Sequence, residues 1–351
     1  MIFSPMKNAT LILLLASLML AGCLRPEPTE PDTRVIITLE KEIDTRGWSR
    51  DVMVEGDYLF VAASQAGAQI WDMAGDEPQM LWDTLITDKV AELIRYDAVN
   101  NIVFIADDGA VHYLLMNTTL TDVDTAYYNN PWLAIFDPKI FSDGNTEDMA
   151  LLEAEDGRIV VLVTDRDFSD GLKRTTLNFN YDVGFDLNYW EPTGNKLVSG
   201  HLRGLDVVGD IVATGWEELG AGLHRVTPVQ VDSLAHRDTP GDVLDVTFYG
   251  EYLLAAADWG GLQIMTWDTT QLDLVASLDL EETVKHIAVW EDLAVLSCGN
   301  DECYIVDLSD PLEPEFDQFL PTGYCYRTFV QDDHIYAATR EGVKIYSIER
   351  R

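Results

Sequence analysis

The sequence predicts an all-β fold, a β-propeller of seven four-stranded blades, with six blades as the second possibility. Three observations predict it. A pattern of alternating apolar residues and tight turns recurs along the chain. Its later copies have their first turns at residues 209, 250, 291 and 332, hence 41 residues apart, which suits four short strands. A lone strand-like segment before the first copy supplies the strand that the last copy lacks.

Residues 1–22 have the pattern of an export signal. Lys7 precedes an apolar run from Ala9 to Leu20, which is too short to span a bilayer as a helix. The run ends in Leu20-Ala21-Gly22-Cys23, which resembles a bacterial lipobox. That resemblance implies acylation of Cys23 and a lipoprotein anchored in the cell envelope outside the cytoplasm, in the outer membrane if the host has one. The alternatives are an ordinary signal peptide or a core helix.

Residues 23–33 alternate proline with acidic side chains and are expected to form an extended tether to the propeller of residues 34–351. The chain has 61 acidic and 23 basic residues, a net charge of −38. Such a surface repels nucleic acid and anionic lipid, so we expect no nucleic-acid partner, membrane contact through the anchor only, and a monomer. The acidity fits a saline habitat, or else a cationic or basic partner.

The repeat is clearest from Asp245 to Ile264, where three apolar runs are separated by glycine-containing turns. The same pattern begins at Asp51. Further β-rich segments, such as Met80–Ile86, read as fourth strands. The last copy ends near Ile348 without one, and the segment Arg34–Leu39 can pair there and close the ring, which would remove two exposed sheet edges.

The segment Tyr304-Ile305-Val306-Asp307-Leu308-Ser309-Asp310-Pro311 resembles the defining segment of the LVIVD-repeat propeller proteins. The stretches Asp51–Trp71 and Asp245–Ile264 are similar to the same unit, although the Asp-Leu-Ser-Asp-Pro ending is complete in one copy only. The resemblance implies a propeller of an exported surface protein. It supplies no general catalytic residues.

Cys298 and Cys303 flank a turn-rich stretch between two apolar runs. An exported protein can keep disulfides, so we expect these two cysteines to face each other across a hairpin and to be linked. Zinc is the alternative, but two cysteines without a nearby histidine pair make an incomplete site. Cys325 is then left over.

The chain contains no hydrolase nucleophile elbow, zinc-protease motif or phosphate-binding glycine loop, and we expect no catalytic residue, no cofactor and no metal. His201 and His286 are the only acid–base candidates that could approach one face of the ring. The stretch Asp165–Gly171 has alternating carboxylates that calcium favours, but it does not match a standard calcium loop and can be an ordinary turn.

A base lies five or six residues before the first turn in five of the seven repeats: Arg50, Arg95, Arg203, Lys285 and Arg327. In a propeller this is the start of the innermost strand, at the mouth of the central channel. The loops that carry Trp216 and Trp259 should open on the same face. A basic ring within an acidic shell would attract anions. Equally, each base could pair with a local acid such as Asp51 or Asp206.

These observations favour a non-enzymatic, surface-anchored scaffold that binds a protein, a glycan or another anionic ligand at the channel mouth. The alternative is a hydrolase or lyase that acts on an acidic polysaccharide. A fold alone does not separate the two functions.

Overall fold

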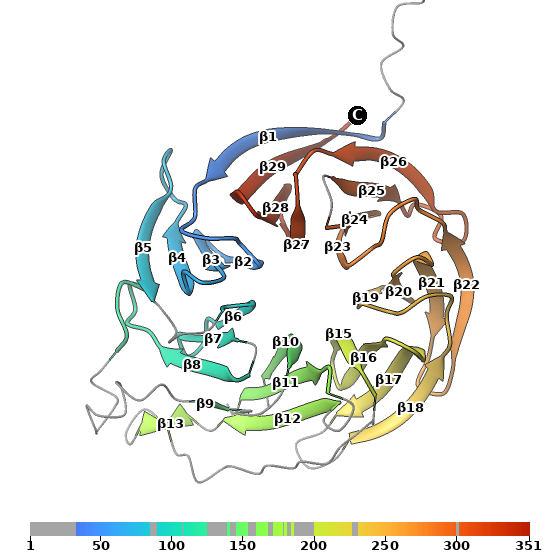
Figure 1. Ribbon diagram of the computed structural model, residues 1–351, viewed down its shortest axis with the longest axis horizontal. Coiled ribbons are helices and arrows are strands. Elements are labelled where there is room, and N and C mark those ends of the chain that lie inside the picture. Colours follow the sequence, from blue (N-terminus) through green and yellow to red (C-terminus); the bar gives the residue numbers. More distant parts are fainter. Residues whose placement is uncertain are drawn as a thin grey trace, which may run out of the picture. The chain divides into compact units, whose positions relative to one another are not determined.

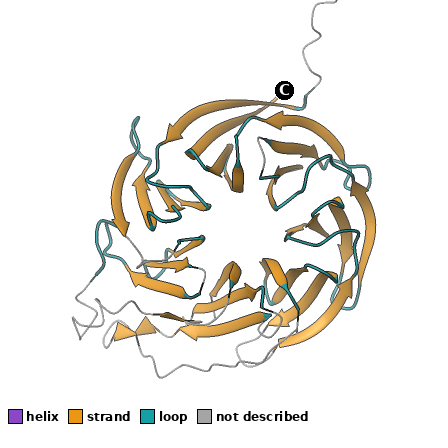
Figure 2. Cartoon of the chain, in the orientation of Figure 1, coloured by secondary structure: helices purple, strands orange, loops and turns teal. Residues whose placement is uncertain are grey.

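The computed structural model describes residues 33–351 with internal gaps at residues 85–89, 108, 125–138, 141–144, 154–158, 168–170, 178, 181–183, 186–199, 227–230 and 300–301. The chain divides into a unit Ile37–Glu349 and a unit Met1–Ile36 with Arg350–Arg351. The first unit is a ring of seven small sheets around a central channel, a seven-bladed β-propeller (Figures 1 and 2). In the described part of the chain no helix is long and apolar enough to cross a bilayer.

The blades follow chain order, and within each one the first strand lies innermost (Figure 1). Blade 1 consists of β2 (Asp51–Glu55), β3 (Tyr58–Ala62), β4 (Ala68–Asp72) and β5 (Gln79–Thr84). Blade 2 consists of β6 (Leu93–Asp97), β7 (Ile102–Ala106), β8 (Val111–Leu115) and β9 (Lys139–Ile140). Blade 3 consists of β10 (Thr146–Glu153), β11 (Ile159–Asp165) and β12 (Leu172–Leu177). Two short strands, β13 (Phe179–Asn180) and β14 (Gly184–Phe185), pair separately after blade 3.

The remaining blades each have four strands. Blades 4 to 7 consist of β15 (Leu202–Val208), β16 (Ile211–Trp216), β17 (Gly220–Val226) and β18 (Val231–Arg237); β19 (Asp245–Tyr249), β20 (Tyr252–Ala257), β21 (Gly261–Trp267) and β22 (Leu272–Leu278); β23 (His286–Trp290), β24 (Leu293–Ser297), β25 (Cys303–Asp307) and β26 (Glu315–Leu320); and β27 (Cys325–Gln331), β28 (His334–Thr339), β29 (Gly342–Arg350) and β1 (Val35–Ile43).

The core lies between neighbouring blades rather than at the centre of the ring. One apolar cluster joins Leu254 and Ile264 of blade 5 to Ile287 and Val306 of blade 6, and similar clusters fill other junctions. Middle strands such as β20 are buried along almost their whole length, because another blade covers each face. Outer strands such as β22 alternate between buried or half-buried and exposed residues. This explains the mixture of continuous and alternating apolar runs in each repeat.

The ring closes as the sequence predicts. Strand β1, from the start of the propeller, lies beside β29 and completes blade 7 (Figure 1). Gly342, at the start of β29, has a φ of +122°, and a Cβ atom there would lie 2.1 Å from the carbonyl oxygen of Ile43. Glycine is therefore required where the closing strand passes, since any side chain would collide with its backbone.

The antiparallel order within each blade decides which residues share a face of the ring. Each first strand begins at the end where the loop between its second and third strands also lies. We call this end the mouth face. It carries the residues before β2, β23 and β27, together with the loop between β28 and β29.

The predicted disulfide between Cys298 and Cys303 is not formed in the structure, where Cys298, Cys303 and Cys325 are free and buried. The reason is register: Ser297, not Cys298, lies opposite Cys303 across the hairpin. The Cys298 thiol instead contacts the carbonyl oxygen of Leu296, at 3.8 Å. Cys303 and Cys325, the latter in the next blade, both contact the hydroxyl group of Ser297, at 4.0 Å and 3.7 Å.

Candidate functional site

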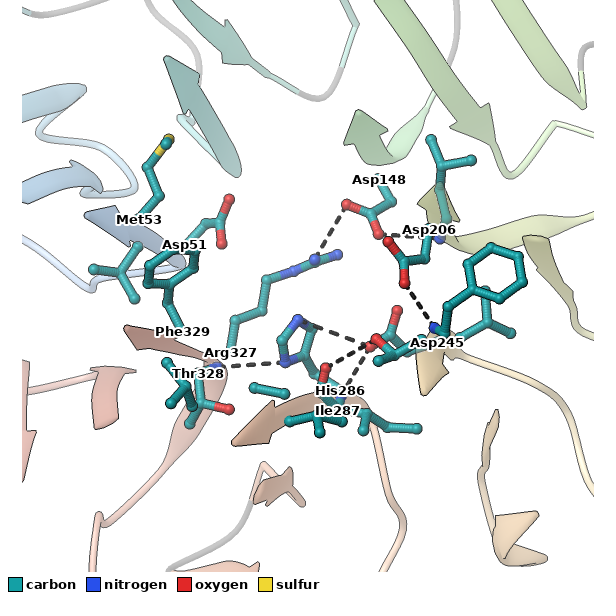
Figure 3. A pocket seen from close by; sticks show the side chains of 18 of the residues that line it. Asp51, Met53, Asp148, Asp206, Asp245, His286, Ile287, Arg327, Thr328 and Phe329 are labelled. Carbon is teal, nitrogen blue, oxygen red and sulfur yellow. Dashed lines mark hydrogen bonds and ion pairs between the residues drawn. The ribbon is translucent and has the colours of Figure 1, made fainter. Parts of the chain in front are cut away.

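Two cavities lie on the axis of the ring. The mouth pocket has a volume of about 400 Å³ and is lined by Arg50, Glu92, Leu93, Asn145, Thr146, Glu147, Arg166, Arg203, Tyr326 and Arg327. The channel pocket has a volume of about 390 Å³, and its polar lining consists of Asp51, Arg95, Asp148, Asp206, Asp245, Thr247, His286, Arg327 and Thr328 (Figure 3). Arg327 lines both cavities, so it marks the boundary between them.

The five predicted bases lie at the centre of the ring but are not at equivalent positions. The backbone N–H of Arg50 and that of Lys285 each bond to the end of the neighbouring second strand, just before β2 and β23 begin. Arg327 lies within β27, and Arg95 lies three residues into β6. The prediction placed each base by counting back from the first turn of its repeat. The turns differ in length, because the β6–β7 turn has four residues, Ala98–Asn101, whereas the β2–β3 turn has two. The bases therefore occupy two levels.

At the inner level, two arginines share one carboxylate. Arg327 of blade 7 reaches across the channel to Asp148 of blade 3, with Nη1 3.2 Å from Oδ1 (Figure 3). Arg95 of blade 2 binds the same oxygen at 3.2 Å and also binds Asp51 of blade 1 at 2.5 Å. Burial would lower the pKa of Arg327, but the carboxylates of Asp148, Asp51 and Asp245 raise it above its ordinary value. Arg327 and Arg95 therefore both form ion pairs that connect different blades.

At the outer level, the arginines are also paired. Arg50 donates from Nε to Glu92 at 2.5 Å. Arg203 binds Glu147 at 2.6 Å through Nη1 and Glu217 at 2.6 Å through Nε. The alternative that each base pairs with a nearby acid thus describes all four predicted arginines.

Carboxylates on the inner strands also connect successive blades through the backbone. Each accepts a hydrogen bond from a backbone N–H of the next inner strand: Asp51 from Ile94 at 3.0 Å, Asp148 from Leu205 at 3.1 Å, Asp206 from Phe248 at 2.7 Å and Asp245 from Ile287 at 2.8 Å. At the junction of blades 6 and 7, the backbone N–H of Thr328 donates to Nδ1 of His286 at 3.4 Å. A polar side chain therefore joins five of the blade junctions at the channel wall.

Burial changes the ionisation of these groups. It raises the pKa of Asp206 to about 6 and that of Asp245 to about 8, and the negative charge of Asp148 adds to both. Burial lowers the pKa of His286 well below its ordinary value, and the cations Arg327 and Arg95 lower it further. The channel thus holds a neutral imidazole beside a carboxyl group that is largely protonated at neutral pH.

The fifth base, Lys285, lies in different surroundings. Its ammonium group is 5.4 Å from the ring centroid of Tyr324 and 3.4 Å from the Tyr324 hydroxyl. Arg340, from the β28–β29 loop, stacks on the same ring at 3.7 Å and lies 5.2 Å from the ring of Trp48. Within the described part of the chain, neither cation has a carboxylate at ion-pair distance.

We call Lys285, Arg340, Tyr324, Tyr326 and Trp48 the mouth cluster. The guanidinium of Arg340 also donates from Nε to the Tyr326 hydroxyl at 3.3 Å, and the Tyr324 and Tyr326 rings are 4.8 Å apart. Tyr326 continues the cluster into the mouth pocket, where Arg50 stacks on its ring at 4.3 Å. Sequence reasoning found Lys285 but missed the others; the aromatic pair around Cys325, directly before a predicted base, was the available signal.

The two predicted tryptophans differ in environment. Trp216 is only 8% exposed, stacks on His224 and donates to the Thr214 hydroxyl at 2.7 Å, so it is a core residue and does not face a ligand. The prediction failed there because Gly222, which has no side chain, leaves room for the indole to fold back onto the blade. Trp259 is 69% exposed in the β20–β21 loop, on the mouth face.

Comparison with known sequences supports the repeat. The LVIVD repeat matches residues 46–73, which include β2, β3 and β4. The chain is a seven-bladed β-propeller that contains an LVIVD repeat. No curated protein matches it.

Solved structures are similar to this propeller in fold. The computationally designed Ika8 protein is 13% identical, with a TM-score of 0.55, 88% of this chain and 98% of that chain covered. A chain of the mitotic checkpoint complex is 13% identical, with a TM-score of 0.62, 92% of this chain and 95% of that chain covered. At this identity the likeness concerns the fold alone, and function must be argued from the site.

The propeller's other chemical candidates are accounted for by local contacts. Asp165, the centre of the possible calcium loop, binds Lys173 at 2.6 Å and accepts the backbone N–H of Asp167; residues 168–170 lie outside the described residues. His201 bonds through Nδ1 to the carbonyl oxygen of Arg166 at 2.6 Å, whereas His286 lies within the channel pocket. The arrangement can bind charged groups at the mouth, but it does not bring these two histidines to one reacting centre.

The channel predicts a stability change with pH. The pKa of Asp245 is about 8 in the folded protein, against roughly 4 for an unfolded aspartate. The stabilisation from its neutral form is therefore complete below about pH 4 and is lost as the pH rises through about 8. Asp245→Asn should raise the melting temperature at pH 9 by about 5 °C and change it little at pH 5.

The control is Asp273→Asn on the exposed face of β22. Thermal unfolding at pH 5, 7 and 9 measures all three proteins. Equal melting curves for wild type and Asp245→Asn at pH 9 would show that the buried carboxyl is not under strain from ionisation.

Proposed function

We propose that this propeller is a lipid-anchored binding scaffold that holds an anionic ligand, such as an acidic glycan, on its mouth face. The contacts of the mouth cluster carry the proposal. Lys285 and Arg340 bear positive charge on a chain whose net charge is −38, and aromatic rings rather than carboxylates hold them. A cation without a counter-ion is the group that an incoming carboxylate or sulfate can pair with.

The two levels of paired arginines explain why the ligand is assigned to the mouth cluster. A ligand that bound Arg50 or Arg203 would have to compete with Glu92, Glu147 or Glu217. Removal of one partner from a buried ion pair is costly because it leaves the other charge uncompensated. Lys285 and Arg340 impose no such cost, since both are exposed and rest on tyrosine.

The aromatic contacts also prepare the cations for binding. Stacking of a guanidinium on a tyrosine face fixes its plane and leaves its outer N–H groups free to donate. Trp48 is 46% exposed beside Arg340 and offers apolar surface for the ring of a sugar. The mouth pocket continues from Tyr326 towards the axis and can receive a group that extends from the cluster.

A binding measurement tests the assignment. Isothermal titration of the protein with galacturonate hexamer, dextran sulfate and citrate in 50 mM salt should find at least one ligand. The double variant Lys285→Gln/Arg340→Gln should weaken its binding by at least tenfold, because two charge-assisted contacts are lost. Binding by the wild type should also weaken as salt is raised to 300 mM.

Arg46→Gln is the matched control, since Arg46 is exposed and already paired with Asp83. It should bind as the wild type does. If no polyanion binds the wild type, the anionic-ligand function is excluded; if the double variant binds normally, the ligand site lies elsewhere.

The anchor is tested separately. Its basis is the lipobox-like Leu20-Ala21-Gly22-Cys23 and the proline-rich segment after it. Cys23→Ser should remove acylation and shift the protein from the membrane fraction to the soluble fraction of the cell envelope, because the acyl chains supply the membrane affinity. A variant that still sediments with membranes and is released only by detergent would show another means of attachment.

A further inference from the structure

Two cysteine side chains lie beneath the mouth cluster at the junction of blades 6 and 7, whereas Cys298 packs in the apolar cluster between blades 5 and 6. Cys303 is the first residue of β25 and Cys325 is the first residue of β27; both are fully buried. Their sulfur atoms contact the same hydroxyl group, that of Ser297, at 4.0 Å and 3.7 Å. One hydroxyl group of blade 6 thus contacts a cysteine from each of the two blades.

The surroundings of the two thiols differ. The hydrogen bond from Cys325, aided by the hydroxyl of Thr322 at 3.5 Å, lowers the pKa of Cys303. Burial raises the pKa of Cys325, and the hydrogen bond to Cys303 raises it further. In the folded ring, Cys303 therefore ionises more readily than Cys325.

We propose that Cys303 and Cys325 form a disulfide that joins blade 6 to blade 7 in an oxidising compartment. The bond would link the third strand of one sheet to the first strand of the next, across a junction that noncovalent contacts otherwise hold. This inference rests on the proposed export of the chain but not on the proposed ligand.

Cys298 is the less suitable partner for Cys303. It lies one residue beyond the position opposite Cys303, and its thiol is directed to a backbone oxygen of its own strand. Burial also raises the pKa of Cys298.

The oxidant is the disulfide of a thiol–disulfide oxidoreductase. The Cys303 thiolate attacks one sulfur of that disulfide, and the other sulfur leaves as a thiolate. Deprotonated Cys325 then attacks the Cys303 sulfur and releases the second thiolate. Two electrons pass to the oxidoreductase, and two protons pass to its thiolates. Because both cysteines are fully buried in the folded ring, the exchange takes place before blades 6 and 7 pack together.

The bond would also constrain the mouth cluster. Tyr324 and Tyr326 are the chain neighbours of Cys325, and their rings hold Lys285 and Arg340. A covalent link at Cys325 would fix this segment to blade 6, from which Lys285 comes.

Peptide mapping of the exported full chain tests the pairing. Trypsin is unsuitable, because residues 286–327 contain all three cysteines and no internal lysine or arginine. A glutamate-specific protease separates them, with Cys298 in residues 292–302, Cys303 in 303–313 and Cys325 in 316–341. Because all three cysteines are buried, free thiols are alkylated in denaturant without reductant. Digestion follows, and the linked peptides are identified by mass spectrometry.

We expect residues 303–313 to be linked to residues 316–341, with Cys298 alkylated. Cys298→Ser is the matched control and should keep the link, whereas Cys325→Ser should lose it. Reduction should lower the melting temperature of the wild type and of Cys298→Ser by about 5 °C, but not that of Cys325→Ser. A link between residues 292–302 and 303–313, or alkylation of all three thiols in the exported wild type, would overturn the proposal.

Discussion

The ion pair between Arg327 and Asp148 determines how the centre of this ring is built. It joins blade 7 to blade 3 across the channel, with Nη1 and Oδ1 3.2 Å apart and the Asp148 side chain 3% exposed. Asp148 also receives Arg95 and the backbone N–H of Leu205. One carboxylate therefore connects residues from blades 2, 3, 4 and 7, and the guanidinium above it separates the mouth pocket from the channel pocket.

This arrangement explains the charge distribution on the axis. The channel pocket contains four aspartates but two arginines, so full ionisation would leave uncompensated negative charge in a half-enclosed space. The raised pKa of Asp245 relieves this, because a neutral carboxyl group still accepts the backbone N–H of Ile287. The arginines at the centre of the ring are paired with carboxylates and therefore serve as structural partners. Lys285 and Arg340 lie outside this network, on the aromatic rings of the mouth cluster, and for this reason we propose them as the binding groups.

The fold could be predicted because its determinants are local. The alternation of apolar residues and the turns occur within each repeat, the later copies are 41 residues apart, and the missing strand of blade 7 is evident from counting. The site could be predicted only in part. The bases were found by position, but their partners lie far along the chain: Arg327 and Asp148 are 179 residues apart. A two-residue difference in turn length also moved Arg95 to a deeper level than counting from the turn had placed it.

Cys298 shows the same limit within one hairpin, since a shift of one residue turns a side chain to the other face of a sheet. Contacts between blades decide which side chains meet at the centre, and these contacts depend on register that spacing does not fix. For this reason Arg340 and Tyr324 were not predicted as site residues, although they lie on either side of the predicted base Arg327 in the sequence.

The most direct test of this account is a double-mutant cycle on the channel ion pair. Arg327→Met, Asp148→Asn and the double variant are compared with the wild type by denaturant unfolding. We expect each single substitution to lower the free energy of unfolding by about 3 kcal/mol, because each removes one ion-pair partner from a charge at the centre of the ring. The double variant should lose about 2 kcal/mol less of its free energy of unfolding than the sum of the two single losses. Additive losses would contradict a structural role for the arginine and would return it to the candidates for ligand binding.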